Sequence, residues 1–146
     1  MLSHEEICQL ILHAGEMCLL DEVIVWDDSS IVCQARSHHN ENHPLREHGR
    51  LAAIHAAEYG AQALAVHSGL IASQNGNLVR PGYLASLRDL KLRVSRLDTI
   101  ESVITITAVR LMADTSNLIY SFQIKEGDRL VAEGKATVMV IQVQQA

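Results

Sequence analysis

The fold is decided by one stretch, Arg50–Ser73, which reads RLAAIHAAEYGAQALAVHSGLIAS. It contains no proline and is rich in alanine and leucine, residues with high helix propensity. We therefore expect one long helix of about 24 residues, or roughly 36 Å at the usual helical rise. Small and apolar residues lie on nearly all of its sides, so this helix should be substantially buried. Its alanines and Gly60 should let a sheet approach closely.

The segments around this helix have strand patterns. Two apolar, β-branched runs before it are separated by an Asp/Ser cluster, which predicts a hairpin of Leu19–Trp26 and Ile31–Ala35. Near the start of the chain, Ser3-x-x-Glu6 is a capping box that predicts a short N-terminal helix. After the long helix, we expect four strands joined by short turns. They are Tyr83–Val94, Ser102–Met112, Leu118–Ile124 and Leu130–Val143.

Short turns between successive strands indicate antiparallel pairing. A sheet of about six strands needs a cover for its apolar face, and the long helix is the one element able to provide it. We therefore predict an α+β protein of the hot-dog architecture, a curved antiparallel sheet wrapped around a long central helix. The chain of 146 residues suits a single domain over residues 1–146. A sandwich with the helix lying flat on one face is the competing fold.

Composition excludes several classes of protein. The net charge of −5 argues against nucleic-acid binding, which needs a cationic surface. Three cysteines without a C-x-x-C pair give no disulfide framework and no zinc knuckle, which favours a reducing compartment. The N-terminus has no basic region typical of a signal peptide, and no uncharged stretch fits a membrane span. The expected location is the cytoplasm.

Glu58 is the first candidate catalytic residue. It lies in the middle of the expected helix, with Leu51, Ile54, Ala61 and Ala65 at helical spacing. If this face is buried, the loss of water favours a neutral carboxyl that can donate a proton. The alternative is a solvated carboxylate on an exposed stripe of the helix.

Histidines provide the candidate base. His43 and His48 lie in the polar loop Ser37–Gly49 before the helix, and a neutral imidazole suits general-base work. His55 lies one turn before Glu58 and is a rival to His43, with core packing or orientation of Glu58 as its expected role. Metal ligation is a second interpretation of the loop histidines, although they meet no standard ligand spacing. These histidines are His38, His39, His43 and His48.

Two further features have both a functional and a structural interpretation. Gly49 closes the loop before the helix, where free N–H groups at a helix start stabilise a developing oxyanion and a glycine permits close approach. The simpler interpretation is that a glycine ends a loop. Positive charge is concentrated after the helix, which fits an acidic partner or a phosphate, whereas the alternative is a solvated strand face. The cations are Arg80, Arg88, Lys91, Arg93 and Arg96.

The sequence resembles the hot-dog 3-hydroxyacyl-acyl-carrier-protein dehydratases over about residues 10–140, most closely the branch of aryl-polyene and related pigment clusters. Two motifs carry the resemblance best, His43-Pro44-Leu45-Arg46 and the helix sequence Glu58-Tyr59-Gly60-Ala61-Gln62. Pro81-Gly82-Tyr83 also resembles this branch. So does the segment around His13, where the wider family reads Pro-His-Arg.

The resemblance implies dehydration of a 3-hydroxyacyl thioester on acyl carrier protein to a trans-2-enoyl thioester. His43 would abstract the C2 proton, and Glu58 would protonate the departing hydroxyl. The chemistry needs no metal and no redox cofactor. Acyl carrier protein is the expected partner. The cations named above are its expected docking site. The substrate-binding set would be His13, His48, Gly49, His55, Gln62 and Tyr83.

Two alternatives to an active dehydratase remain. One is thioester hydrolysis, because hot-dog thioesterases also place a carboxylate on this helix. The other is a low-activity subunit that completes the site of a second hot-dog chain, since the fatty-acid enzymes read His-Phe-Pro-Gly where this chain begins His43-Pro44.

We also expect a dimer, formed either with itself or with another hot-dog chain. Glu58 should lie about eight residues, or roughly 12 Å, beyond a helix start near Arg50. The loop that carries His43 lies on the far side of that start. A homodimer in which each His43 faces the partner's Glu58 would remove this difficulty, and it would also hide the edge strands Ile31–Ala35 or Tyr83–Val94.

Overall fold

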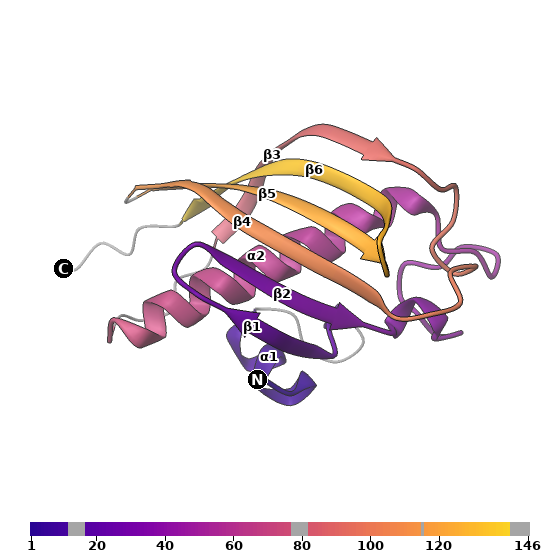
Figure 1. The fold of residues 1–146 in the computed structure, drawn as a ribbon, viewed down its shortest axis with the longest axis horizontal. Helices are drawn as coiled ribbons and strands as arrows, with labels where there is room; N and C mark the ends of the chain where they lie inside the picture. Colours follow the sequence, from indigo (N-terminus) through magenta and orange to yellow (C-terminus); the bar gives the residue numbers. More distant parts are fainter. Residues whose placement is uncertain (12–16, 77–81, 115, 141–146) are drawn as a thin grey trace.

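The computed structural model describes residues 1–11, 17–76, 82–114 and 116–140 (Figure 1). The single-turn 3-10 helices η2 and η3 accompany the regular elements. In chain order the elements are α1 (His4–Leu10), β1 (Glu22–Trp26), β2 (Ser30–Ala35), η2 (Ser37–His39), η3 (Ala53–His55), α2 (Ala56–Gln74), β3 (Gly82–Leu92), β4 (Ile104–Ala113), β5 (Asn117–Glu126) and β6 (Arg129–Val140).

The six strands form one antiparallel sheet in the order β1-β2-β4-β5-β6-β3. The sheet curves over α2, which packs mainly against β4, β2 and β5 (Figure 1). This confirms the predicted α+β class and the predicted wrapping of a sheet around one long helix. Of the two expected edges, β3 is an edge strand, but Ile31–Ala35 is not, because β2 pairs with both β1 and β4.

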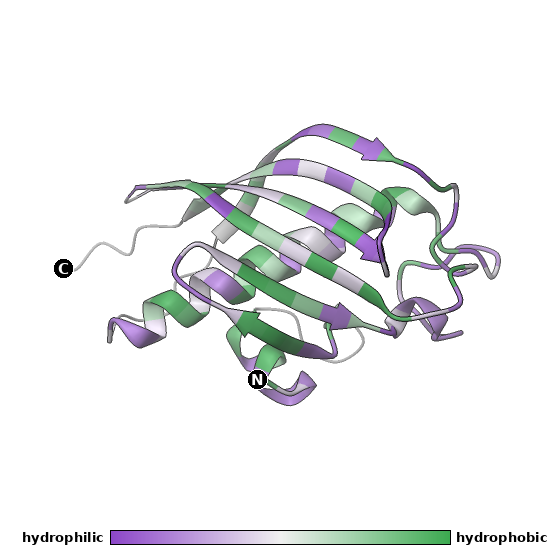
Figure 2. Ribbon diagram, in the orientation of Figure 1, coloured by the Kyte–Doolittle hydropathy of each residue, from purple (hydrophilic) through white to green (hydrophobic). Residues whose placement is uncertain are grey.

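Alternation along the strands decides which side chains face the helix. Figure 2 shows hydropathy alternating along β4 and β5. On β4, Ile104, Ile106 and Ala108 are buried, and the residues between them are more exposed, because successive side chains of a strand point to opposite faces. Aliphatic side chains supply most of this core, as the scarcity of aromatic residues predicts.

One aromatic residue sets how closely the sheet approaches the helix. Phe122 of β5 is 1 % exposed and lies against Gly60 of α2 and Gly134 of β6. A Cβ atom added at Gly60 would lie 2.6 Å from Phe122 Cδ2. The prediction that Gly60 permits close packing is therefore confirmed, and the ring of Phe122 occupies the space.

The central helix begins later than its composition predicts. α2 starts at Ala56 rather than at Arg50, and its 19 residues span about 28 Å. The residues before it pair with the segment that precedes β4, since Ala53 donates to the Ser95 carbonyl and Leu97 donates to the Leu51 carbonyl. These long-range hydrogen bonds override the local helix propensity. As a result, Glu58 lies in the first turn of the helix and not in its middle.

The N-terminal helix is present with its predicted capping box, in which Ser3 and Glu6 cap each other. The expectation about the cysteines was wrong, because Cys8 of α1 forms a disulfide with Cys18. Sequence spacing alone did not show that the chain brings α1 back beside the segment before β1. Cys33 is a free, buried thiol, and burial raises its pKa to about 12. In the described part of the chain, no helix has both the length and the apolar character needed to cross a membrane.

Candidate active site

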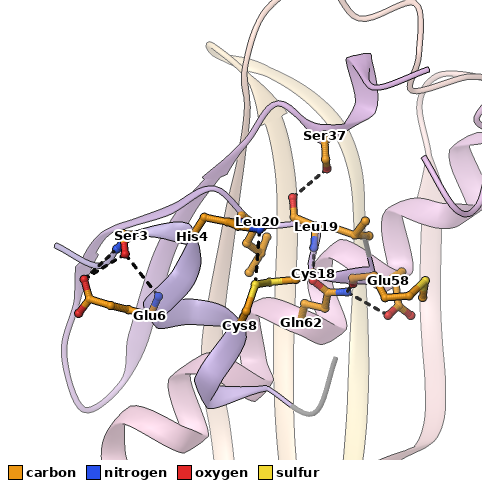
Figure 3. The surroundings of a disulfide bond; sticks show 11 residues. Ser3, His4, Glu6, Cys8, Cys18, Leu19, Leu20, Ser37, Glu58 and Gln62 are labelled. Carbon is orange, nitrogen blue, oxygen red and sulfur yellow. Dashed lines mark hydrogen bonds between the residues drawn. A yellow bond between two sulfur atoms is a disulfide. The ribbon is translucent and has the colours of Figure 1, made fainter. Parts of the chain in front are cut away.

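The half-buried carboxyl of Glu58 is held by a neighbouring amide (Figure 3). The side-chain nitrogen of Gln62, one turn further along α2, donates to Glu58 Oε1 at 3.3 Å. Glu58 also lies in the first turn of α2. Glu58 is therefore placed by the helix start and oriented by Gln62.

Gln62 is itself fixed by the segment that precedes β1. Its oxygen accepts the Leu19 N–H at 2.8 Å, and its nitrogen donates to the Met17 carbonyl at 2.6 Å as well as to Glu58. The side chain is 1 % exposed, so these bonds are shielded from water. Both amide hydrogens are used within the protein. Gln62 is predicted to bind substrate; the structure shows its side chain in hydrogen bonds to Glu58 and to the segment before β1, and its role in substrate binding stays a prediction.

His43 lies beside the start of α2 of its own chain. Its Nδ1 accepts the Leu45 N–H at 3.1 Å, and its Nε2 lies 3.1 Å from the Tyr59 hydroxyl. The loop therefore folds back to the residue next to Glu58, and the geometric reason for expecting a site shared between two copies was wrong. It failed because the helix starts six residues later than expected, at Ala56 rather than Arg50.

These contacts fix the protonation state of His43. Because Nδ1 accepts a hydrogen bond, the neutral ring carries its proton on Nε2 and donates it to the Tyr59 oxygen. His43 is 4 % exposed, and this burial, followed by the charge of Arg46, lowers its pKa to about 4. The ring is thus neutral near pH 7, but its Nε2 serves as a hydrogen-bond donor.

A chain of hydroxyl groups continues from His43, and no sequence pattern indicated it. The Tyr59 hydroxyl is 2.7 Å from Ser37 Oγ, and Ser37 Oγ donates to the Leu19 carbonyl at 2.8 Å. Burial raises the pKa of Tyr59, so the phenol stays protonated. This chain of hydroxyl groups ends on the peptide segment that also holds Gln62. In the sequence, the position of Tyr59 directly after Glu58 was the one feature that indicated a role for Tyr59 near the site.

The loop before α2 is held together by Arg46. Its guanidinium donates to the carbonyls of His38, Asn40 and Gly49. His38 and His39 each place Nε2 near a backbone carbonyl, those of Ser102 and Ile100. Among the described residues, the loop histidines do not bring three ligand atoms together, so the metal interpretation of this loop receives no support.

Gly49 does not lie at a helix start. His48 and Gly49 have φ values of 51° and 75° and form the tip of a two-residue turn between Glu47 and Arg50, a conformation that favours glycine. The oxyanion interpretation of Gly49 rested on an adjacent helix, and the later helix start removes that basis. His55 takes the N-cap position of α2, one turn before Glu58.

Several predicted site residues lie elsewhere or outside the described part. His13 and Arg80 are outside the described residues, and for Tyr83 only the backbone pairing with Met139 is described. Arg96 is bound to Asp98, whose carboxylate also accepts the Leu51 N–H, so Arg96 has an ion-pair partner within the fold, and its role in docking stays a prediction. The remaining cations, Arg88, Lys91 and Arg93, are exposed.

Comparison with known proteins assigns this chain to a family. The model of the ApeP-like family, described as ApeP dehydratase, matches residues 5–146. No curated protein matches the chain.

Solved structures share the fold. The chain is similar to the dehydratase heterocomplex ApeI:P from Xenorhabdus doucetiae, with a TM-score of 0.85, 22 % identity, and coverage of 97 % of this chain and 93 % of that chain. It is also similar to a hypothetical thioesterase with coenzyme A from Streptococcus pneumoniae TIGR4 (TM-score 0.59, 14 % identity, coverage 85 % and 88 %). The conserved protein PA5202 from Pseudomonas aeruginosa is similar as well (TM-score 0.61, 16 % identity, coverage 91 % and 98 %). These matches confirm the hot-dog fold, and the family match shows that the chain belongs to the ApeP-like dehydratases.

Proposed function

We propose that this chain takes part in the reversible removal of water from 3-hydroxyacyl thioesters carried on acyl carrier protein, giving trans-2-enoyl thioesters. The observation that carries the proposal is the carboxyl of Glu58, half-buried at the start of α2 and oriented by Gln62, in a chain of a dehydratase family. A carboxylic acid in such a position protonates a departing 3-hydroxyl, which leaves as water.

The elimination also needs a base for the C2 proton, and we propose that a second hot-dog chain supplies it. Within this chain the neutral ring of His43 has its proton on Nε2 and its lone pair engaged by the Leu45 N–H. Proton abstraction by His43 would require breaking these buried hydrogen bonds. We propose that His43 instead positions Tyr59 and the peptide segment at Leu19.

Pairing with a second, different chain has independent support. A structurally similar protein is described as the dehydratase heterocomplex ApeI:P. In this chain β3 is an edge strand of the sheet, with backbone groups available for further pairing. The proposed assembly is a heterodimer in which Glu58 faces the base of the partner.

His43 as the base remains the sequence-based hypothesis, and one variant separates it from the positioning role. In the active pair, His43→Asn keeps an acceptor for the Leu45 N–H but cannot titrate. If His43 is the base, kcat should fall by about 100-fold or more and the corresponding limb of the pH profile should disappear. A positioning role predicts a smaller fall with the pH profile retained.

Acyl carrier protein is the proposed carrier because Arg88, Lys91 and Arg93 present exposed positive charge on β3 and just after it. Complementary charge accelerates encounter with an acidic partner and is weakened by salt. Reversing Lys91 and Arg93 to glutamate should lower kcat/KM on carrier-linked substrate and flatten its salt dependence. Arg36→Glu, an exposed arginine near the opposite edge of the sheet, is the matched control. Equal salt dependence in all three proteins would contradict this docking site.

Thioester hydrolysis is the second candidate, because a chain of similar fold is described as a hypothetical thioesterase with coenzyme A. The two reactions give different products, a conjugated enoyl thioester or a free thiol. The test is to purify the chain alone and with hot-dog chains encoded beside it, and to follow both products from a 3-hydroxyacyl thioester. We expect enoyl product from the pair and little from the chain alone. Thiol release without enoyl product would refute the proposal.

A further inference from the structure

The Cys8–Cys18 disulfide connects α1 to the segment before β1, which binds the Gln62 side chain (Figure 3). Cys8 lies in the last turn of α1 and is half-buried, whereas Cys18 is 4 % exposed. An external thiol can therefore reach the sulfur of Cys8 more easily than that of Cys18. Thiol–disulfide exchange depends on such access to one sulfur.

A histidine stands beside the accessible sulfur. His4, one turn before Cys8 on α1, has its Nδ1 2.7 Å from the Leu20 carbonyl and its Nε2 3.5 Å from Cys8 Sγ. The carbonyl can only accept, so Nδ1 carries a proton and Nε2 is directed to the sulfur. When Cys8 is released as a thiol, Nε2 can accept the thiol proton, and the imidazolium formed stabilises the Cys8 thiolate.

The buried sulfur lies next to the peptide groups that hold Gln62. Met17 and Leu19, on either side of Cys18, provide the carbonyl and the N–H that bind the Gln62 side chain. Gln62 in turn donates to Glu58. The disulfide thus anchors a segment that lies two hydrogen bonds from the candidate acid.

We propose that Cys8 and Cys18 form a reversible thiol–disulfide pair, with His4 as the group that stabilises the Cys8 thiolate, and that their redox state controls how firmly Glu58 is positioned. Two molecules of a small thiol such as glutathione reduce the pair. The first attacks Cys8 and releases Cys18 as a thiol, and the second releases Cys8 and leaves as oxidised glutathione. Two electrons and two protons pass to the protein.

The direction of the effect follows from the anchoring. In the disulfide form, Cys18 is fixed to α1, and its neighbours hold Gln62 rigidly. Reduction removes this covalent anchor and weakens the hydrogen bonds that hold Gln62. If Gln62 then loses its hydrogen bond to Glu58, kcat should fall about fivefold. This part of the inference rests on the proposed role of Glu58, while the redox chemistry of the pair does not.

The first test measures the redox chemistry alone, on the wild-type protein. The chain is equilibrated in glutathione buffers of increasing reduced fraction, and its free thiols are trapped and counted by mass spectrometry. We expect both forms to be populated across the series and Cys33, which is buried, to remain unreacted in the folded protein. His4→Gln should slow disulfide formation by oxidised glutathione. A pair that stays oxidised in excess reduced glutathione would overturn the proposal.

The second test measures coupling to the site. In the active pair of chains, reduction should lower kcat about fivefold, equivalent to about 1 kcal/mol, with KM unchanged. Cys8→Ser should be insensitive to redox buffer, whereas Cys33→Ser should respond like the wild type. If a chelator restores the activity of the reduced protein, a metal bound by His4 and the two thiols is responsible, and the proposal is overturned.

A spectroscopic readout keeps this test separate from the proposed function. The side-chain amide signals of Gln62 in an NMR spectrum should shift between the oxidised and reduced forms, even if neither form has activity. Unchanged Gln62 signals would refute the coupling. Absent activity with shifted signals would refute the proposed function and leave the coupling intact.

Discussion

Lowering the pH should destabilise this protein in part through the buried side chain of His43. The folded state holds His43 neutral, with a pKa of about 4, and the unfolded imidazole binds a proton at a pKa of about 6.5. Because the unfolded state binds more protons between these values, the free energy of unfolding falls as the pH drops below about 6.5 and levels off near 4. At pH 4.5 the loss from His43 alone is about 2.5 kcal/mol.

Two other histidines act in the same direction and must be separated from His43. Burial also lowers the pKa of His38 and of His67, and His67 is buried between the Tyr120 hydroxyl and the Asp27 carbonyl. A comparison with His43→Asn cancels their contribution and that of the carboxyl groups. The asparagine does not titrate and keeps an acceptor for the Leu45 N–H.

The assay is urea unfolding of both proteins at pH 7.5 and pH 4.5, followed by circular dichroism. The wild type should lose about 2.5 kcal/mol more than His43→Asn on acidification. Equal losses would show that His43 is not held neutral by its surroundings, and the argument for its fixed tautomer would then fail. Nitrogen chemical shifts of the ring, with the proton on Nε2 at neutral pH, provide an independent check.

Two further predictions concern packing and the lead into α2. Gly60→Ala should destabilise the fold by about 1–3 kcal/mol, because the new methyl group meets the ring of Phe122, whereas Gly69→Ala in the same helix meets only ordinary contacts and should be neutral or stabilising. Equal urea midpoints for the two variants would contradict this. Asp98→Ala should cost about 1–3 kcal/mol, because it leaves the buried Leu51 N–H without its acceptor, and an unchanged urea midpoint would show that this bond contributes nothing.

Most of the fold was predictable because it depends on local periodicity. Alternating β-branched residues predicted β4 and β5, a capping box predicted α1, and an alanine-rich stretch predicted α2. The start of α2 was not predictable. Leu51 and Ala53 have helical neighbours in sequence but form hydrogen bonds with residues near position 96, and no local pattern shows such a contact.

The sequence identified candidate residues of the site but not the hydrogen bonds between them. Glu58 and His43 stood out by type and position, but the tautomer of His43 depends on the Leu45 N–H and on Tyr59. Gln62 was predicted to bind substrate, and sequence alone does not show its hydrogen bonds to the segment before β1. The disulfide was missed for the same reason, since its two cysteines meet only after the chain folds.

The central claim is that Glu58 is the proton donor of a dehydration reaction, and one comparison tests it most directly. The complex of this chain with its hot-dog partner is assayed on a carrier-linked 3-hydroxyacyl thioester, as wild type, as Glu58→Gln and as Glu47→Gln, an exposed control before α2. The account predicts that Glu58→Gln lowers kcat by about 100-fold or more, while Glu47→Gln keeps wild-type activity. Wild-type formation of the enoyl product by Glu58→Gln would contradict it.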